Sequence, residues 1–278
     1  MAKITAAEVN KLRKHTGAGM MDCKKALVEA EGNFELAIEV LRKKGQKVAA
    51  KRADRDNTEG AVIAVISDDK TKGALISLNC ETDFVAMNDD FVKLAYSFAN
   101  LALNSTAANL DEFLASEFAE GLTVAEKLVE QTGVVGEKIE VKAYYQLEAP
   151  LVGAYIHAGN KIAAMTALSA NVEGADVAAK DVSMQAAAMN PVAMDETGVD
   201  QAIIEKEIEI AKDQLRQEGK PEAMLDKIAE GKLKRFFKDN TLVNQAFIKD
   251  SKKSVADYVK SFDKDLKVTA YVRVGLGA

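Results

Sequence analysis

The chain has 278 residues, with 37 basic and 43 acidic side chains and a formal net charge of -6. This balance disfavours a broad electrostatic surface for nucleic acid, so we expect no direct nucleic-acid partner. No apolar run approaches the roughly 20 residues of a membrane-crossing helix, and the first residues lack the apolar core of a signal peptide. We therefore expect a cytoplasmic protein with no membrane partner.

The first 56 residues carry the signals of three short helices and a basic linker. The run Thr5-Ala6-Ala7-Glu8 is a capping box that starts the first helix, which is expected to end near His15. The second helix is expected over about 21–30 and the third from 33 to about 45, where glycines mark the ends. Residues 46–57 are basic with few apolar side chains, which predicts a helical or flexible linker. A bundle with so little core stands alone only marginally and is typical of a recognition module.

Two consecutive methionines, Met20 and Met21, lie at the corner between the first two helices. The glycines beside them lack the GxxxxGK[ST] spacing and the preceding strand of a phosphate-binding loop. A bundle of this size cannot bury both methionines, so at least one is expected to be exposed. An exposed methionine is flexible and adapts well to a partner surface.

The composition changes after the linker, and residues 57–148 read as an α+β unit. Strand-like runs at 61–66 and 73–78 are joined by a turn and predict a β-hairpin. A helix is expected to open at Asn88, because apolar residues after it recur at steps of three and four. The remaining expected elements of this unit are helices around 111–118 and 124–131 and a strand over 137–147.

The hairpin is joined to that helix by a short connection that carries Asp83 and Phe84. Such connections lie at the surface. In one interpretation Phe84 folds back onto the sheet as core and Asp83 braces the turn, because large apolar side chains are mostly buried. In the other, the ring is an exposed anchor for a partner, with the acid beside it. The connection alone favours burial, and both interpretations stay open.

Residues 149–278 are expected to form a second unit of the same kind. A hairpin over 151–156 and 161–169 followed by a helix over 175–189 repeats the order of the first unit. This repetition predicts two related subdomains side by side.

The second unit also contains a stretch of a different kind. Ile204, Ile208, Ala211 and Leu215 step by four, three and four before a sharp reversal at Gly219-Lys220-Pro221. With a return helix after the reversal, this predicts an antiparallel helical hairpin over about 199–238. A closing strand over 267–274 can return to the second unit's sheet, which would make the helical hairpin an insertion.

Side chains for bond-making chemistry are sparse. The histidines His15 and His157 have no neighbours at metal-ligand spacing, and no nucleophile elbow, Rossmann fingerprint or Walker loop occurs in the sequence. We therefore expect no metal and no cofactor. Cys23 and Cys80 form no CxxC pair and are expected to be buried and reduced, so thiol chemistry at Cys80 is the weakest hypothesis. A chain of this kind more often acts by binding.

Two segments carry a resemblance to a known family: residues 12–27 (LRKHTGAGMMDCKKAL) and residues 79–86 (NCETDFVA). Both resemble signature segments of the translation elongation factor Ts family, and the resemblance extends over essentially the whole chain. It implies a helical domain like a ubiquitin-associated (UBA) domain at 1–56, with the basic linker. It further implies a core N-subdomain at 57–148 and a core C-subdomain at 149–278 with the inserted helical hairpin.

The resemblance implies a guanine nucleotide exchange factor for elongation factor Tu, which acts by binding and is not an enzyme. In the family, the segment that corresponds to Thr82, Asp83, Phe84 and Val85 enters the GTPase near its magnesium and phosphate site. Met20 and Met21 would contact the nucleotide-binding domain of the GTPase, and His157 another of its domains. The alternative is a binding scaffold with a UBA-like domain and no effect on nucleotide. A homodimer or a 2:2 complex is left open.

Overall fold

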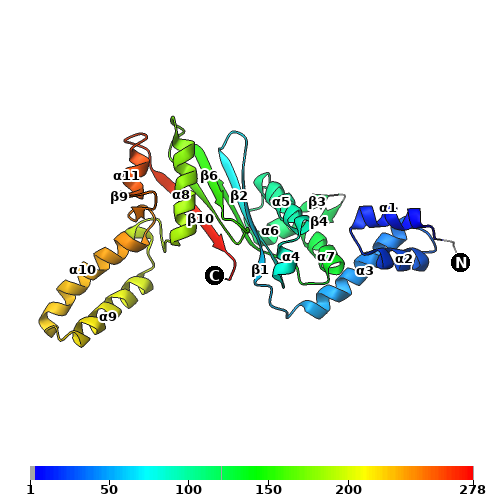
Figure 1. Ribbon diagram of the computed structural model, residues 1–278, viewed down its shortest axis with the longest axis horizontal. Helices are drawn as coiled ribbons and strands as arrows, with labels where there is room; N and C mark the ends of the chain where they lie inside the picture. Colours follow the sequence, from blue (N-terminus) through cyan, green and yellow to red (C-terminus); the bar gives the residue numbers. More distant parts are fainter. Residues whose placement is uncertain (1–3, 120, 278) are drawn as a thin grey trace.

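The computed structural model describes residues 4–119 and 121–277 (Figure 1). The molecule is elongated, with three N-terminal helices at one end, strands and covering helices in the middle, and two long antiparallel helices at the other end (Figure 1). The expected α+β class is confirmed. Among the described residues, no helix combines the length and apolar character needed to cross a membrane.

The N-terminal helices are α1 (Ala6–Thr16), α2 (Met20–Glu29) and α3 (Phe34–Arg52). The capping box at the start of α1 is present. Small and aliphatic side chains form the core of this bundle, among them Leu12, Cys23, Leu27 and Ala37. The likeness of the bundle to a UBA domain stays a prediction, as do the domain boundaries after residues 56 and 148.

The expected end of the third helix near residue 45 is wrong, because α3 continues to Arg52. Gly45 is buried in the middle of α3, where it packs against α7 (Val124–Val135). A Cβ atom added to Gly133 of α7 would lie 2.5 Å from the Cα atom of Gly45, so the two helices touch backbone to backbone. Gly45 therefore serves close helix packing and does not end the helix.

The linker follows its helical alternative up to Arg52, and the segment after it is held against strand β5 (Glu140–Glu148). The Lys138 Nζ atom donates to the carbonyl oxygen of Ala53 at 2.7 Å. The Asn57 side-chain amide donates to Glu140 at 2.9 Å, and Lys142 donates to the Asn57 carbonyl at 3.1 Å. These contacts fix the junction between the bundle and the core.

The core contains two three-stranded antiparallel sheets. The first has the order β1 (Glu59–Ile66), β2 (Lys72–Cys80), β5, and the second the order β10 (Val268–Gly275), β7 (Ile162–Leu168), β6 (Leu151–Ile156). Helix α5 (Asp89–Leu103) packs on the first sheet and α8 (Ala175–Met189) on the second. Alternation along β1 puts Ile63 into the core under α5 and Val62 into a separate cluster with Met165 of the second sheet. Each sheet is thus covered by its own helix and joined to the other sheet.

The turn of each core hairpin accepts a hydrogen bond from the first strand of the other hairpin. The Val62 N–H donates to the carbonyl oxygen of Asn160, and the Val152 N–H donates to that of Lys70, both at 2.7 Å. Lys70 and Asn160 both have a positive φ, 59° and 58°. The two donor residues, 62 and 152, are 90 positions apart in the chain, and so are the two acceptor residues, 70 and 160. This reciprocal pattern is what two related units predict.

The two long helices are α9 (Gln201–Gln217) and α10 (Glu222–Asn240), which reverse at Gly219 with a φ of 73°. Ala211 and Leu215 of α9 are buried with Leu225 and Ala229 of α10. After α10 the chain forms α11 (Val255–Lys260) and returns as β10 beside β7. The helical hairpin therefore lies in the chain between α8 and the last strand of the second sheet.

The differences from expectation are short elements and element ends. Residues expected to form a helix up to 118 form α6 (Leu110–Ala115) followed by strand β3 (Glu117–Ala119). Other short elements that the sequence analysis did not predict are α4 (Asp83–Ala86), β4 (Leu122–Thr123), the 3-10 turn η1 (Glu196–Gly198), β8 (Ala246–Phe247) and β9 (Asp250–Ser254). Strands this short are set by their pairing partners and carry no period of their own.

Two glycine-to-alanine changes are expected to have opposite effects on the free energy of unfolding, because only one of the two glycines lies in the contact between α3 and α7. Gly133→Ala places a methyl group against the backbone of Gly45 and should lower the free energy of unfolding by about 1–3 kcal/mol. Gly231→Ala lies within α10 with open space around the new Cβ atom and should raise it by about 0.5–1 kcal/mol. Denaturant unfolding of both variants measures this, and a Gly133→Ala protein as stable as Gly231→Ala would contradict the close contact.

Candidate functional site

The segment around Asp83 and Phe84 is a one-turn helix, α4, between strand β2 and helix α5. Thr82 caps the turn, since its hydroxyl oxygen accepts the Val85 N–H at 3.4 Å. Asn88 then caps α5 by accepting the Asp90 N–H at 2.8 Å. The connection is therefore two capped helix starts in succession, which leaves little freedom to the residues between them.

The side chains of α4 divide into an inner and an outer pair. Val85 is half-buried and packs against the core under α5, and Ala86 is buried in that core. Asp83 is exposed, and Phe84 is 84% exposed. The ring of Phe84 is therefore not part of the core, which excludes the first interpretation of this connection. Its role as an anchor for a partner stays a prediction.

Two glutamates, Glu81 and Glu137, hold the start of the turn by hydrogen bonds. One Oε atom of Glu137 accepts the N–H groups of Glu81 and Thr82 at 3.1 and 3.0 Å, and the other accepts the Thr82 hydroxyl at 2.7 Å. Glu81 in turn accepts from Arg52, with both carboxylate oxygens 2.8 Å from one Nη atom, and from the Lys138 N–H at 2.7 Å. Burial alone would raise the pKa of Glu81, but the hydrogen bond from Lys138 and the Arg52 guanidinium outweigh it and lower that pKa.

Sequence reasoning missed Arg52, Glu81 and Glu137 as parts of this site. Glu137 lies 55 residues from Thr82 in the chain, and Arg52 lies 29 residues from Glu81. No local pattern marks such distant pairs. Gly136, which ends α7 with a φ of 82°, is the nearest signal, because it shows that the chain turns sharply just before Glu137.

A hollow lies on each side of the turn. Phe84 and Val85 line one hollow together with Leu94 of α5, Val134 of α7 and Gly17 of the N-terminal bundle. Asp83 lines the other, together with Met87 and Tyr96. The opposite wall of that second hollow is the β6–β7 turn, with Gly159, Asn160 and Lys161. The ring and the carboxylate thus border different recesses, the first near the bundle and the second near the second core unit.

The other predicted site residues are also at the surface. Met20 and Met21 are 52% and 63% exposed in the first turn of α2, which confirms that at least one of them is accessible. His157 is exposed in the β6–β7 turn, where its Nδ1 atom lies 3.1 Å from the Tyr155 hydroxyl. His157 itself does not line the recess beside Asp83, although its turn does.

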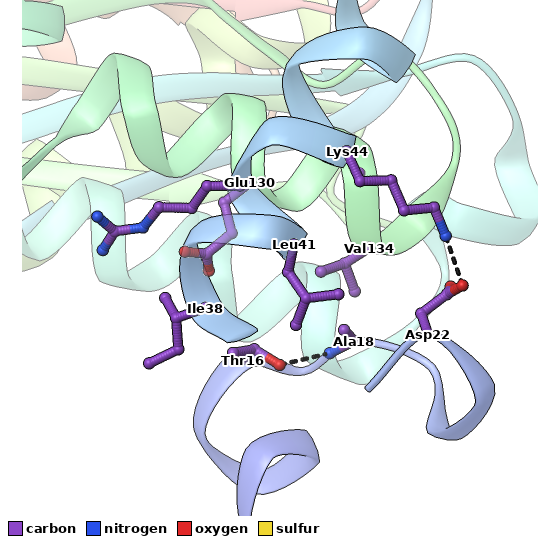
Figure 2. A pocket seen from close by; sticks show the side chains of 10 residues that line it. Thr16, Ala18, Asp22, Ile38, Leu41, Lys44, Glu130 and Val134 are labelled. Atoms are coloured by element: carbon purple, nitrogen blue, oxygen red, sulfur yellow. Dashed lines mark hydrogen bonds and ion pairs between the residues drawn. The ribbon is translucent and has the colours of Figure 1, made fainter. Parts of the chain in front are cut away.

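A small pocket marks the junction between the bundle and α7 (Figure 2). Figure 2 shows Leu41 of α3 and Val134 of α7 facing it, with Lys44 paired to Asp22 at its rim. Val134 connects the two, because it is a residue of α7 and packs against the buried side chains of the bundle. This packing joins α7 to the N-terminal bundle, which carries Met20 and Met21.

The site offers little for bond-making chemistry. Within residues 4–119 and 121–277, no three His, Cys, Asp or Glu side chains gather as metal ligands. Cys80 is fully buried below the turn and donates to the Thr82 carbonyl at 3.2 Å. Burial, together with the nearby charge of Glu137, raises the pKa of Cys80 to about 12. Its sulfur therefore stays protonated at neutral pH, which disfavours the thiol hypothesis.

Comparison with known proteins assigns the chain to a family. The model of the family described as "Elongation factor TS" matches residues 81–278, which begin at the turn that bears Phe84. Elongation factor Ts of Christiangramia forsetii is 71% identical over 277 residues, and that of Flavobacterium psychrophilum 65%, each over 100% of both chains. Elongation factor Ts of Porphyromonas gingivalis is 44% identical over 275 residues, 99% of each chain. These relatives cover the N-terminal helices as well, and the chain belongs to the elongation factor Ts family.

Proposed function

We propose that this protein is a guanine nucleotide exchange factor that binds elongation factor Tu·GDP in the cytoplasm and promotes GDP release during translation elongation. Membership of the elongation factor Ts family supports the partner and the process. The observation that carries the mechanism is the exposed ring of Phe84 on a firmly held turn. The protein acts by binding alone, and no bond is made or broken.

The four residues of the turn have different tasks in this proposal. Thr82 and Val85 fix the turn, one by capping and one by packing. The ring of Phe84 acts as a wedge that displaces an element of the GTPase beside its nucleotide. Asp83 brings a negative charge to the place where magnesium and phosphate are held, so it repels the phosphate and competes for hydrogen bonds of the magnesium shell.

Exchange by this route follows from thermodynamic linkage. A factor that weakens the affinity of the GTPase for nucleotide by some ratio has its own affinity for the GTPase weakened by nucleotide in the same ratio. In this proposal, Phe84 and Asp83 make the contacts that stabilise the nucleotide-free state of the GTPase. Contacts made equally in both states change the affinity for the GTPase and leave the release rate at saturation unchanged.

Met20 and Met21 are proposed to supply contacts of this second kind. They lie on the N-terminal bundle, which we propose is a UBA-like module that grips the nucleotide-binding domain of the GTPase. His157, in the turn across the recess from Asp83, is proposed to contact another domain of it. The three contact regions would come from the N-terminal domain (1–56), the core N-subdomain (57–148) and the core C-subdomain (149–278).

Removing the wedge or its acid should slow catalysed nucleotide release. Phe84→Ala is expected to lower the rate of fluorescent GDP release from elongation factor Tu at saturating factor at least tenfold, since an aromatic anchor contributes about 2 kcal/mol or more. Asp83→Ala should lower it in the same direction. Stopped-flow release with purified proteins measures both. The control is Tyr145→Ala, which removes another exposed aromatic ring, from β5 opposite Leu75 of β2.

Equal release rates for the wild type, Phe84→Ala and Tyr145→Ala would rule out the assigned roles. A wild-type protein that binds elongation factor Tu without changing GDP release would instead support the scaffold alternative.

Truncating Met20 and Met21 should weaken binding to elongation factor Tu without changing the rate of GDP release once the factor is bound. A Met20→Ala/Met21→Ala protein is expected to raise the factor concentration needed for half-maximal GDP release by about tenfold, because two adaptable apolar contacts are lost. The maximal rate should stay within about twofold of wild type. Met224→Ala is the control, since this methionine is also 52% exposed but lies on α10. A lower maximal rate with an unchanged half-saturation point would contradict this division of roles.

The buried thiols should be unreactive in the folded protein. Cys23 and Cys80 are both fully buried, and burial raises the pKa of each. The thiol reagent DTNB is therefore expected to react slowly with the native protein at pH 8 and to label two thiols per chain in denaturant. Rapid labelling of one thiol in the native state would revive the thiol hypothesis.

A further inference from the structure

We propose that Glu137 is a positioning residue for nucleotide exchange: its carboxylate fixes the start of α4 and so aims Asp83 and Phe84 at the GTPase. The Arg52–Glu81 ion pair ties the same turn to the N-terminal bundle. This inference rests on the proposed exchange function, and it concerns residues that do not themselves form the wedge.

The turn needs support from outside, because α4 is only four residues long. A single helical turn is unstable by itself, since nucleation fixes several dihedral angles in return for one hydrogen bond. Glu137 supplies that support by accepting three hydrogen bonds from the two residues directly before α4. The Thr82 hydroxyl both donates to Glu137 and accepts the Val85 N–H, so the carboxylate also orients the cap of the turn.

Glu137 is itself held in a rigid place. It directly follows Gly136, the left-handed residue that ends α7, and α7 is pressed against α3 at Gly45 and Gly133. The next residue contributes as well, because the Lys138 N–H donates to Glu81 at 2.7 Å. The segment after α7 therefore holds two consecutive residues, Glu81 and Thr82, by hydrogen bonds with Glu137 and Lys138.

Arg52 closes a ring of contacts through this site. It is the last residue of α3, and its guanidinium pairs with the Glu81 carboxylate at 2.8 Å. The path runs from α3 through Arg52 and Glu81 to Thr82, then through Glu137 to α7, which packs back on α3. Stiffness of this kind matters for a wedge, because a loosely held ring would swing aside when the partner resists displacement.

A second glutamate that accepts from a threonine, at the other end of α7, serves for comparison. Glu126 accepts the N–H and the hydroxyl of Thr123 at 2.8 and 3.1 Å in the capping box that begins the helix. Glu137 and Glu126 thus make the same kind of bonds to a threonine, but only Glu137 supports the turn that bears Phe84. A glutamate-to-glutamine change at each position separates positioning from general stability.

The test measures fluorescent GDP release from elongation factor Tu over a range of factor concentrations. Glu137→Gln keeps the size of the side chain but replaces one acceptor oxygen with an amide donor. It is expected to lower the maximal release rate by about five- to tenfold, with the half-saturation concentration within about twofold of wild type. Glu126→Gln should leave both values near wild type. Circular dichroism and thermal unfolding verify that each variant is folded.

A double mutant gives a readout that a purely structural role would not produce. If Glu137 acts by aiming the ring, Glu137→Gln should lower the rate much less in a Phe84→Ala background than in the wild type. Arg52→Gln, which breaks the other half of the ring of contacts, should show the same dependence on Phe84.

The outcomes separate this inference from the proposed function. A Glu137→Gln rate equal to wild type, a loss matched by Glu126→Gln, or a loss of the same size with and without Phe84 would overturn the positioning role while exchange activity stands. A wild-type protein that fails to accelerate GDP release would overturn the proposed function itself. A loss confined to Glu137→Gln and dependent on Phe84 would support the positioning role.

Discussion

The backbone contact between α3 and α7 at Gly45 and Gly133 determines how the rest of the site is built. Because two glycines face each other, the helices approach closely enough for the end of α3 to bring Arg52 to Glu81. The same contact fixes α7, and the residue after its terminal glycine, Glu137, supports the start of the turn that bears Phe84. The N-terminal bundle and the turn that bears Phe84 are therefore connected by continuous contacts through α3, α7 and Glu137. A bulky side chain at either glycine would disturb surfaces that lie far from it along the chain.

The two core units share the order of hairpin, connection and helix, and the connection of the first unit carries the exposed ring of Phe84. Their hairpins correspond at a difference of 90 residues, as the bonds from Val62 and Val152 show. Their 15-residue helices begin at 89 and 175, a difference of 86. Eight residues, 81–88, separate β2 from α5, and six residues, 169–174, separate β7 from α8, so the first connection is two residues longer. Strand β2 is itself two residues longer than β7. The one-turn helix α4 lies within the longer connection. In the second unit the start of α8 is covered by Phe262, whose ring lies 3.1 Å from the position of a Cβ atom on Gly174. Phe262, from the segment after α11, thus covers the start of α8, whereas the ring of Phe84 beside the start of α5 is exposed.

Much of this fold follows from local signals. The helix predicted over 175–189 coincides with α8, and the reversal at Gly219 and the return of the last strand were both foreseeable from period and turn residues. What could not be predicted depends on partners distant in sequence. Gly45 looks like a helix end until α7 is placed beside it, and Glu137 gains its role only when the chain after α7 reaches Thr82. The exposure of Phe84 also contradicts the usual preference of large apolar side chains for the core.

That exposure sets a scale for the proposed mechanism. Burying a phenylalanine ring is worth about 1.5–3 kcal/mol, and the free protein forgoes most of this gain at Phe84. If the ring is buried only against the nucleotide-free GTPase, linkage converts this gain into a roughly ten- to hundredfold weakening of nucleotide affinity. The same modest figure lets incoming nucleotide expel the factor again. A larger effect on GDP needs a second contribution that also vanishes when nucleotide returns, and the charge of Asp83 on the neighbouring face of the turn is suited to supply it.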